Sequence, residues 1–273
     1  MTTTAPPRVS RLSTTAIKGL GVVHPDVGDL TPTGVVGDRR FFLVDPDDAL
    51  RSAFRTGAWM GYTAAYDAEA DALTVTCPNG SEVTGEVRLG DALLADFYRY
   101  KKVAGRVVEG PWAEVLSAAA GRPVRLVRAD DDNGGLDVRP VTLLGDASSA
   151  ELGRRAGLSE VDGRRFRMLV GISGTSPHAE DGWAGRSLGI GEAVVRVEGP
   201  VKRCGAVNID PGDGSADLRV LRLIKAYRGF GETVLGRGVT FGVYAEVVAP
   251  GRIRVGDEIE LDVDRFGTAP GPR

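Results

Sequence analysis

Hydrophobic residues occur along this chain in short runs that turn-forming residues separate. The segments 41–45 (FFLVD), 123–129 (PVRLVRA) and 192–201 (EAVVRVEGPV) combine β-branched or aromatic residues with nearby Pro, Gly or Asp. Runs of this kind predict β-strands. In segment 72–87, two β-branched runs flank a Pro-Asn-Gly turn, which predicts a β-hairpin. The pattern therefore favours a strand-rich fold.

Three segments carry helical signals instead. Segment 110–121 has Pro111 at its expected first turn and Gly121 at its expected C-terminal cap. Segment 140–157 predicts a strand followed by a helix that a serine caps. In segment 216–229, apolar residues recur at roughly helical spacing. We therefore expect a mainly β (α+β) fold with a few inserted helices.

Composition agrees with a globular protein and argues against several functions. Of the 273 residues, 42% are hydrophobic and 26% are charged, which are ordinary values for a folded chain. The formal net charge of -3, without a long basic run, gives little support to a nucleic-acid surface. No run approaches the roughly 18 apolar residues of a membrane span, and the N-terminal stretch lacks the apolar centre of a signal peptide. We expect a cytoplasmic protein with no nucleic-acid or membrane partner.

The few cysteines and histidines limit the metal chemistry that the chain can support. Cys77 and Cys204 lie far apart without a CxxC spacing, which predicts free thiols. His24 and His178 are too few for a His-rich zinc or iron site. Two basic residues directly precede Cys204, and neighbouring cations favour a thiolate. On this local pattern alone, Cys204 can equally be a packing residue or a functional one.

Basic residues gather at the starts of two predicted strands. A Gly-Asp turn delivers Arg39 just before segment 41–45, and segment 164–170 (RRFRMLV) places Arg165 and Arg167 on one face if it alternates as a strand. Such residues can be solvated strand ends. They can also bind an anion, because guanidinium matches phosphate with paired N–H donors.

Two further residues extend this hypothesis of an anion site. Lys18, in the segment TAIKGLG, could converge with the arginines on one phosphate-bearing cofactor. Ser148 stands at the start of an expected helix, where it can be the N-cap, or can lie beside a phosphate that the helix N-terminus binds. Sequence order alone does not bring these residues together.

Taken in order, these segments resemble the MOSC family, named after the C-terminal domain of molybdenum cofactor sulfurase. IKGLG and GVVGDRRFFLVD resemble the N-terminal β-barrel domain of such proteins, and PVTLLGDASSAEL, RRFRMLVGISG, VKRCGAVNIDPGDG and FGVYAEVVAPGRIRVGDEIEL resemble the MOSC domain. The resemblance implies an N-terminal MOSC β-barrel domain over residues 8–129 and a MOSC β-barrel domain over residues 136–264. The acidic, turn-rich segment 130–135 is the candidate boundary, although it is equally compatible with a surface loop inside one domain.

Within this family, the resemblance points to the amidoxime-reducing component and its bacterial counterparts, which use a pterin-based molybdenum cofactor to reduce N-hydroxylated compounds. It implies that Cys204 is the catalytic residue and the protein ligand of the metal, a role that suits a soft thiolate. Lys18 matches the family's pterin-side lysine, and Arg39 matches the arginine of its DR motif. Arg167 matches the second arginine of its RFRPN motif.

The expected activity is therefore that of a molybdenum cofactor-dependent oxidoreductase. The residues expected to bind the cofactor are Lys18, Arg39, Ser148, Arg165, Arg167 and Cys204. No flavin, iron–sulfur or aminotransferase domain is visible in the chain, so a small-molecule substrate would receive electrons from a separate flavin or iron–sulfur protein. Two alternatives remain open: a non-catalytic carrier of the cofactor or of sulfane sulfur, and a cofactor-free β-barrel that binds a small molecule.

Overall fold

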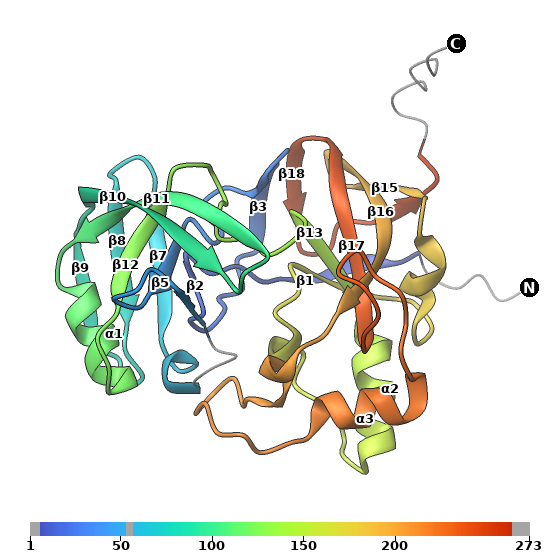
Figure 1. Ribbon diagram of the computed structural model, residues 1–273. Coiled ribbons are helices and arrows are strands. Elements are labelled where there is room, and N and C mark those ends of the chain that lie inside the picture. Colours follow the sequence, from blue (N-terminus) through green and yellow to red (C-terminus); the bar gives the residue numbers. More distant parts are fainter. Residues whose placement is uncertain (1–5, 53–56, 264–273) are drawn as a thin grey trace, which may run out of the picture.

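The computed structural model describes residues 6–52 and 57–263 and contains mainly β-strands (Figure 1). Its two halves lie side by side, one formed largely by the first half of the chain and the other by the second. The predicted mainly β class with a few helices is confirmed, since the described residues hold three α-helices among 19 strands. The helices are α1 (Trp112–Ala120), α2 (Asp146–Ala156) and α3 (Val220–Arg228).

The second half is a seven-stranded sheet that curls into a nearly closed barrel. Its strand order is β1-β14-β13-β17-β16-β15-β19, and a β-bridge between Arg8 and Glu258 joins the region of its two edges. The strands are β1 (Arg8–Leu12), β13 (Val141–Gly145), β14 (Val170–Ser173), β15 (Ser187–Ile190), β16 (Ala193–Lys202), β17 (Thr240–Ala249) and β19 (Ile259–Leu261). Buried aliphatic side chains from these strands form its core, while α2 and α3 cover a second core around Phe241.

Two sheets make up the other half. The larger follows the order β10-β11-β12-β5-β2, with β6 paired to β5, and the smaller follows β7-β8-β9. Their bounds are β2 (Ile17–Lys18), β5 (Phe41–Val44), β6 (Leu50–Arg51), β7 (Thr63–Asp67), β8 (Ala72–Thr76), β9 (Glu82–Glu86), β10 (Arg88–Phe97), β11 (Lys101–Glu109) and β12 (Arg125–Ala129). Because side chains alternate across a strand, Phe41 and Leu43 of β5 join the core shared with α1 and β8, whereas Phe42 and Val44 pack beneath β10 and β11.

Several local predictions are confirmed by the backbone. Strands β8 and β9 form the expected hairpin around the Pro-Asn-Gly turn. Helix α1 begins directly after Pro111, and Gly121 caps its end in the left-handed conformation, with its N–H donating to the carbonyls of the last turn. Strands β13 and β14 are parallel neighbours joined through α2.

Two local predictions are wrong. Gly145, and not a serine, is the N-cap of α2, and Ser148 lies inside the first turn with its hydroxyl bonded to another segment. Residues Gly163–Phe166 form a 3-10 helix, η2, in place of the predicted strand start. The Asp162 carboxylate accepts a hydrogen bond from the Arg164 N–H and so begins this helical turn.

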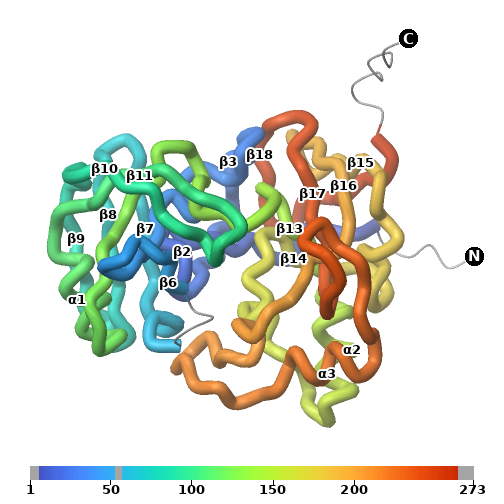
Figure 2. The backbone as a smooth tube through the Cα atoms, in the orientation of Figure 1, coloured from blue at the N-terminus to red at the C-terminus, as the bar shows by residue number. Residues whose placement is uncertain are grey.

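The two halves are joined through several strands and one loop. Strand β1 pairs with β14, and β3 (Val27–Thr31) pairs with β18 (Gly251–Arg254) as well as with β4 (Gly34–Val35). The loop after β16 reaches the first half at Gly57 of η1 (Gly57–Trp59), where Gly214 approaches so closely that neither position has room for a side chain (Figure 2). The division into domains at residues 8–129 and 136–264 stays a prediction. Strands β1 and β3 of the first range pair with β14 and β18 of the second.

Candidate functional site

A cleft of about 640 Å³ lies between the two halves of the molecule. Its first wall comes from β2, the turn before β5, and the β10–β11 turn; its second comes from η2, the end of β16 and the start of the loop that follows. This volume is within the range of pockets that hold a small molecule or cofactor. The cleft therefore depends on segments that are far apart in the sequence.

The lining of this cleft is strongly basic. Asp137 is the only acidic residue among the described residues that line it. The basic residues are Lys18, Arg39, Arg139, Arg165, Arg167, Lys202 and Arg203. Such a lining favours an anionic ligand, because a low-dielectric cleft lined by one sign of charge concentrates the potential.

On the first wall, Lys18 is buried and forms an ion pair with Asp137. Its Nζ lies 2.8 Å from Asp137 Oδ1, and the Tyr100 hydroxyl donates to the same oxygen at 3.1 Å. Burial lowers the pKa of Lys18, Asp137 opposes this effect, and Arg39 and Arg167 add to it by repulsion. For Asp137, desolvation raises the pKa, but the charge and hydrogen bond of Lys18 outweigh it and hold the pKa below its usual value.

Arg39 and Arg167 meet where the two halves join. Both have left-handed backbones, with φ of 51° and 53°, a conformation that a non-glycine residue adopts only when its surroundings hold it. Arg39 Nη2 donates to the Arg167 carbonyl at 3.2 Å, and Arg167 Nη1 donates to the Leu20 carbonyl at 2.6 Å. Burial, together with repulsion from Arg39, lowers the pKa of Arg167 to about 10. Two guanidinium groups are thus held together inside the cleft.

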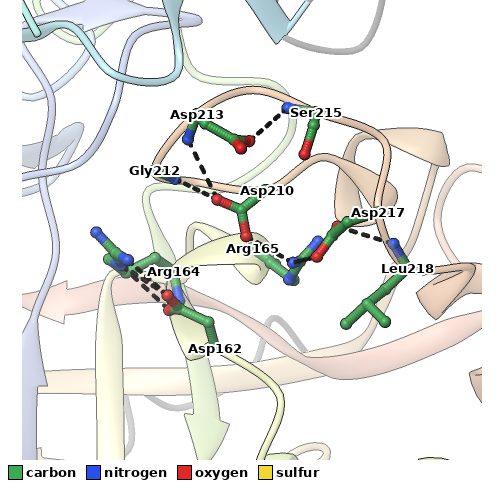
Figure 3. Close-up of polar contacts among 9 residues, drawn as sticks. All are labelled: Asp162, Arg164, Arg165, Asp210, Gly212, Asp213, Ser215, Asp217 and Leu218. Atoms are coloured by element: carbon green, nitrogen blue, oxygen red, sulfur yellow. Dashed lines mark hydrogen bonds and ion pairs between the residues drawn. The ribbon is translucent and has the colours of Figure 1, made fainter.

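On the second wall, Arg165 fastens the loop that follows Cys204. Figure 3 shows its guanidinium pointing toward two carboxylates of this loop, Asp210 and Asp217, and its Nη2 lies 2.8 Å and 2.6 Å from their oxygens. The Arg165 side chain is only 3% exposed, whereas the side chains of Asp210 and Asp217 are 30% and 38% exposed, so only the arginine end of these bonds is shielded from solvent. Its Nε and Nη1 atoms are buried without a hydrogen-bond partner. Arg165 therefore has free donors in addition to those that hold the loop.

Cys204 is a free, exposed cysteine at the end of this wall. It is the N-cap of η4 (Gly205–Asn208), and Val207 in that turn is fully buried in the core beneath α3. Arg203 lies under it, donating from Nη2 to the Phe166 carbonyl at 2.7 Å and stacking over the Phe166 ring. The thiol is thus open to the cleft although the backbone around it is anchored on both sides.

Comparison with known proteins connects this site to a family. The sequence model of the MOSC domain matches residues 130–260, which include the second wall and Cys204. The chain contains a MOSC domain. It is 31% identical over 140 residues to the human protein named mitochondrial amidoxime-reducing component 1, and 32% identical over 129 residues to its mouse counterpart. These matches cover 50% and 46% of this chain but only 41% and 37% of the relatives' own length.

Solved structures also match the chain, at low identity. The YuaD protein from Bacillus subtilis matches with a TM-score of 0.46 and 13% identity, over 94% of this chain and 96% of that one. The YiiM protein from Escherichia coli matches with a TM-score of 0.33 and 17% identity, over 48% of this chain and 57% of that one.

The six residues predicted to bind a cofactor do not all lie together. Lys18, Arg39, Arg165, Arg167 and Cys204 line the cleft beside and within the MOSC domain. Ser148 does not line it: its hydroxyl is buried, donates to Glu180 Oε1 at 2.7 Å and accepts the His178 N–H at 2.8 Å. A cofactor-binding role for any of the six stays a prediction.

Sequence reasoning missed several polar residues of the cleft, among them Asp137, Tyr100 and Tyr244. Asp137 directly follows the turn-rich segment 130–135, Tyr100 lies in the β10–β11 turn, and Tyr244 lies in β17 of the MOSC domain. Burial raises the pKa of Tyr244 to about 12, so its hydroxyl stays protonated at neutral pH. The only signal for Asp137 was an acidic residue close to a candidate domain junction, and no local signal distinguished the tyrosines from packing residues.

The described residues hold neither a helix suited to span a membrane nor a cluster of side chains suited to bind a metal. None of the helices in ranges 6–52 and 57–263 has the length and hydropathy of a membrane span. In the same ranges, no three His, Cys, Asp or Glu side chains gather in a way that could hold a metal ion by themselves.

Proposed function

We propose that this protein binds a molybdenum cofactor in the cleft and reduces N-hydroxylated small molecules with electrons from a separate donor protein. The observation that carries the proposal is the exposed thiol of Cys204 at the end of a cleft with seven basic residues and one acidic residue. The MOSC domain and the similarity to proteins named amidoxime-reducing components support it. In this proposal Cys204 is the metal ligand and catalytic residue.

The residues of the cleft fit a pterin cofactor that carries phosphate. Buried donors without a partner, Nε and Nη1 of Arg165 and Nε of Arg203, supply bonds that an anion would satisfy. Lys18, Arg39 and Arg167 provide cationic groups, of which the two arginines are held by backbone carbonyls, while Lys18 and Arg39 are held by the carboxylates of Asp137 and Asp38. A soft sulfur ligand from Cys204 suits a metal that is otherwise held by sulfur and oxygen.

When bound, the cofactor would supply two-electron redox chemistry at the metal. For an amidoxime, the balanced reaction is R–C(NH2)=NOH + 2 e⁻ + 2 H⁺ → R–C(NH2)=NH + H2O, in which the N–O bond breaks and the oxygen leaves as water. The chain's own residues bind and orient: Lys18 and the arginines neutralise the phosphate, and Arg165 holds the loop that presents Cys204. The protonated hydroxyl of Tyr244 lines the cleft and can donate a hydrogen bond to substrate, whereas that of Tyr100 already donates to Asp137.

Metal content tests the proposal. Protein produced in a host that makes the cofactor is expected to contain close to one molybdenum per chain, and Cys204→Ser is expected to lose it. Because the Cys204 side chain is exposed, the variant is expected to keep the wild-type denaturation midpoint. Cys77→Ser, which removes the other free thiol, is the matched control and is expected to keep the metal. Wild-type protein without molybdenum would overturn the proposal.

Turnover separates an enzyme from a carrier. With reduced methyl viologen as electron donor, the molybdenum-loaded protein is expected to convert benzamidoxime to benzamidine, and Cys204→Ser is expected to lower the rate by at least about 100-fold. Metal without turnover would instead identify a carrier of the cofactor.

The location of the protein in the cytoplasm remains part of the proposal, and the relatives named above are called mitochondrial.

A further inference from the structure

A group of exposed apolar side chains lies on the loop between α3 and β17. Phe230, Val234 and Leu235 are 49%, 57% and 41% exposed. They fall within six consecutive residues, whereas the other large exposed hydrophobic residues of ranges 6–52 and 57–263 are dispersed along the chain. A concentration of apolar surface of this kind is typical of a site that contacts another molecule.

The surroundings of this loop are basic, in contrast to the rest of the chain. Segment 219–239 holds five arginines and lysines and one acid, Glu232, although the whole protein has a net charge of -3. Of these cations, Arg228 pairs with Asp181, while Lys225 and Arg237 lie over the Phe230 ring, at 4.8 Å and 5.6 Å from its centroid. In the part of the chain that the structure describes, Lys225 and Arg237 have no ion-pair partner. Apolar side chains framed by cations are the composition that an acidic protein surface complements.

This loop also forms part of the rim of the cleft. Leu235 lines the cleft together with Cys204, and its carbonyl accepts a hydrogen bond from Lys202 Nζ at 2.9 Å. Helix α3, which carries Lys225, is tied to the turn after Cys204 because Asn208 Oδ1 accepts the Leu221 N–H at 2.9 Å. A molecule that contacts Phe230, Val234 and Leu235 would therefore sit at the opening of the site.

We propose that Lys225, Phe230, Val234, Leu235 and Arg237 form the docking surface for an acidic, one-electron carrier protein. The inference rests on the proposed function, because only a reductase requires such a donor. Its reason is the position of the surface: electron transfer weakens steeply with distance, and a donor bound here lies at the rim of the cleft that holds Cys204. Small, partly polar contacts suit transient redox encounters, and complementary charge raises their association rate.

The test compares two kinds of electron donor for benzamidoxime reduction by the molybdenum-loaded protein. One is reduced methyl viologen, which needs no docking surface; the others are acidic proteins, a reduced [2Fe–2S] ferredoxin and a reduced flavodoxin. The double variant Lys225→Glu/Arg237→Glu is expected to raise KM for the protein donor by at least about tenfold, with the viologen rate changed less than about twofold. Added salt is expected to weaken the wild-type reaction with the protein donor, because screening acts on exposed charges.

A matched control places the same change of charge elsewhere. Arg88→Glu/Arg122→Glu reverses two exposed cations of the first half that do not line the cleft, and is expected to leave both reactions unchanged. Phe230→Ser tests the apolar part and is expected to raise KM for the protein donor without reversing a charge.

The outcomes distinguish this inference from the proposed function. If the wild-type protein works with methyl viologen but with neither acidic protein, or if the double variant keeps the wild-type KM, the docking surface is wrong and the reductase proposal stands. If methyl viologen also fails with the metal-loaded protein, the proposed function itself fails. A rise in KM for the double variant alone, with the control unchanged, supports the surface.

Discussion

The two walls of the cleft carry similar cations but hold them in different ways. On the wall of the MOSC domain, Arg165 binds two carboxylates of its own chain and Arg203 binds a backbone carbonyl, so these groups keep the segment around Cys204 in place. On the opposite wall, Arg39 likewise pairs with a buried carboxylate, Asp38, but Lys18 has one carboxylate partner, Asp137, whose side chain is half exposed. Residue type alone therefore does not distinguish a cation that stabilises the fold from one that is available to a ligand. The distinction depends on which carboxylates and carbonyls of the chain each cation contacts.

The largest expected effect is on the MOSC wall. Arg165→Met keeps an apolar stem but leaves Asp210 and Asp217 without their shared partner. We expect a loss of about 1–3 kcal/mol in the free energy of unfolding, because a buried guanidinium loses two charge-assisted bonds that solvent screens in part at the exposed carboxylates. Urea denaturation of the cofactor-free protein measures it.

The neighbouring residue provides the control for that variant. Arg164 forms an ion pair with Asp162, but its side chain is 44% exposed, so Arg164→Met is expected to cost less than about 1 kcal/mol. Equal losses in the two variants would show that burial does not distinguish these arginines and would remove the contrast between the walls.

A smaller effect on stability and a larger one on binding are expected for Lys18→Met. Removing the ion pair is offset by removing the desolvation cost of the buried ammonium, so the unfolding free energy at pH 7 is expected to change by less than about 1 kcal/mol. Molybdenum content is expected to fall by about tenfold, because one charged contact to the cofactor is lost. A large loss of stability with normal metal content would contradict the assignment of Lys18 to the ligand.

The same variant carries a pH signature whose sign follows from the lowered pKa of Lys18. The unfolded chain keeps this proton up to about pH 10.5, whereas the folded protein releases it at lower pH. Between these two values the unfolded state binds more protons, so the contribution of Lys18 to stability rises with pH. The denaturation midpoint of the wild-type protein, measured across this pH window, is therefore expected to rise more steeply with pH than that of Lys18→Met. Equal slopes in the two proteins would show that Lys18 does not titrate with a lowered pKa in the folded state.

The smallest expected effect is a gain of binding in Asp137→Asn. The carboxylate competes with an anionic ligand for Lys18, so its removal is expected to tighten binding of inorganic pyrophosphate to the cofactor-free protein by about threefold to tenfold. Isothermal titration calorimetry measures the affinity. Weaker binding in the variant would show that Asp137 assists the ligand and does not compete with it.

Much of the local architecture followed from the order of residues in the chain. Strand runs such as 41–45, the hairpin within 72–87 and the caps of α1 depend on periodicity and on nearby Pro, Gly and Asn, which act over a few residues. The resemblance to the MOSC family was also carried by short motifs in a fixed order. Local chemistry therefore determined the mainly β class, and the resemblance, rather than the local pattern, singled out Cys204.

Predictions that depended on distant partners were less successful. Ser148 turns away from the cleft because Glu180, 32 residues further along the chain, offers a buried acceptor. The strand start expected at Arg165 failed for a local reason instead, because the nearby Asp162 caps a 3-10 turn. The role of Asp137 as the partner of Lys18 could not be predicted, because only folding brings these two residues, more than 100 positions apart, into contact.

By itself, the sequence determined most of the strand segments, the ends of α1 and the set of cations and thiols from which a site could be built. Only the tertiary structure decided which of these groups share a cleft, which are held by partners of their own chain and which stay open to a ligand. The physical reason is that charge and hydrogen bonding act through space: Arg165 and Lys18 differ by the carboxylates that the fold places beside them and by their exposure, and neither property is written in the residues next to them.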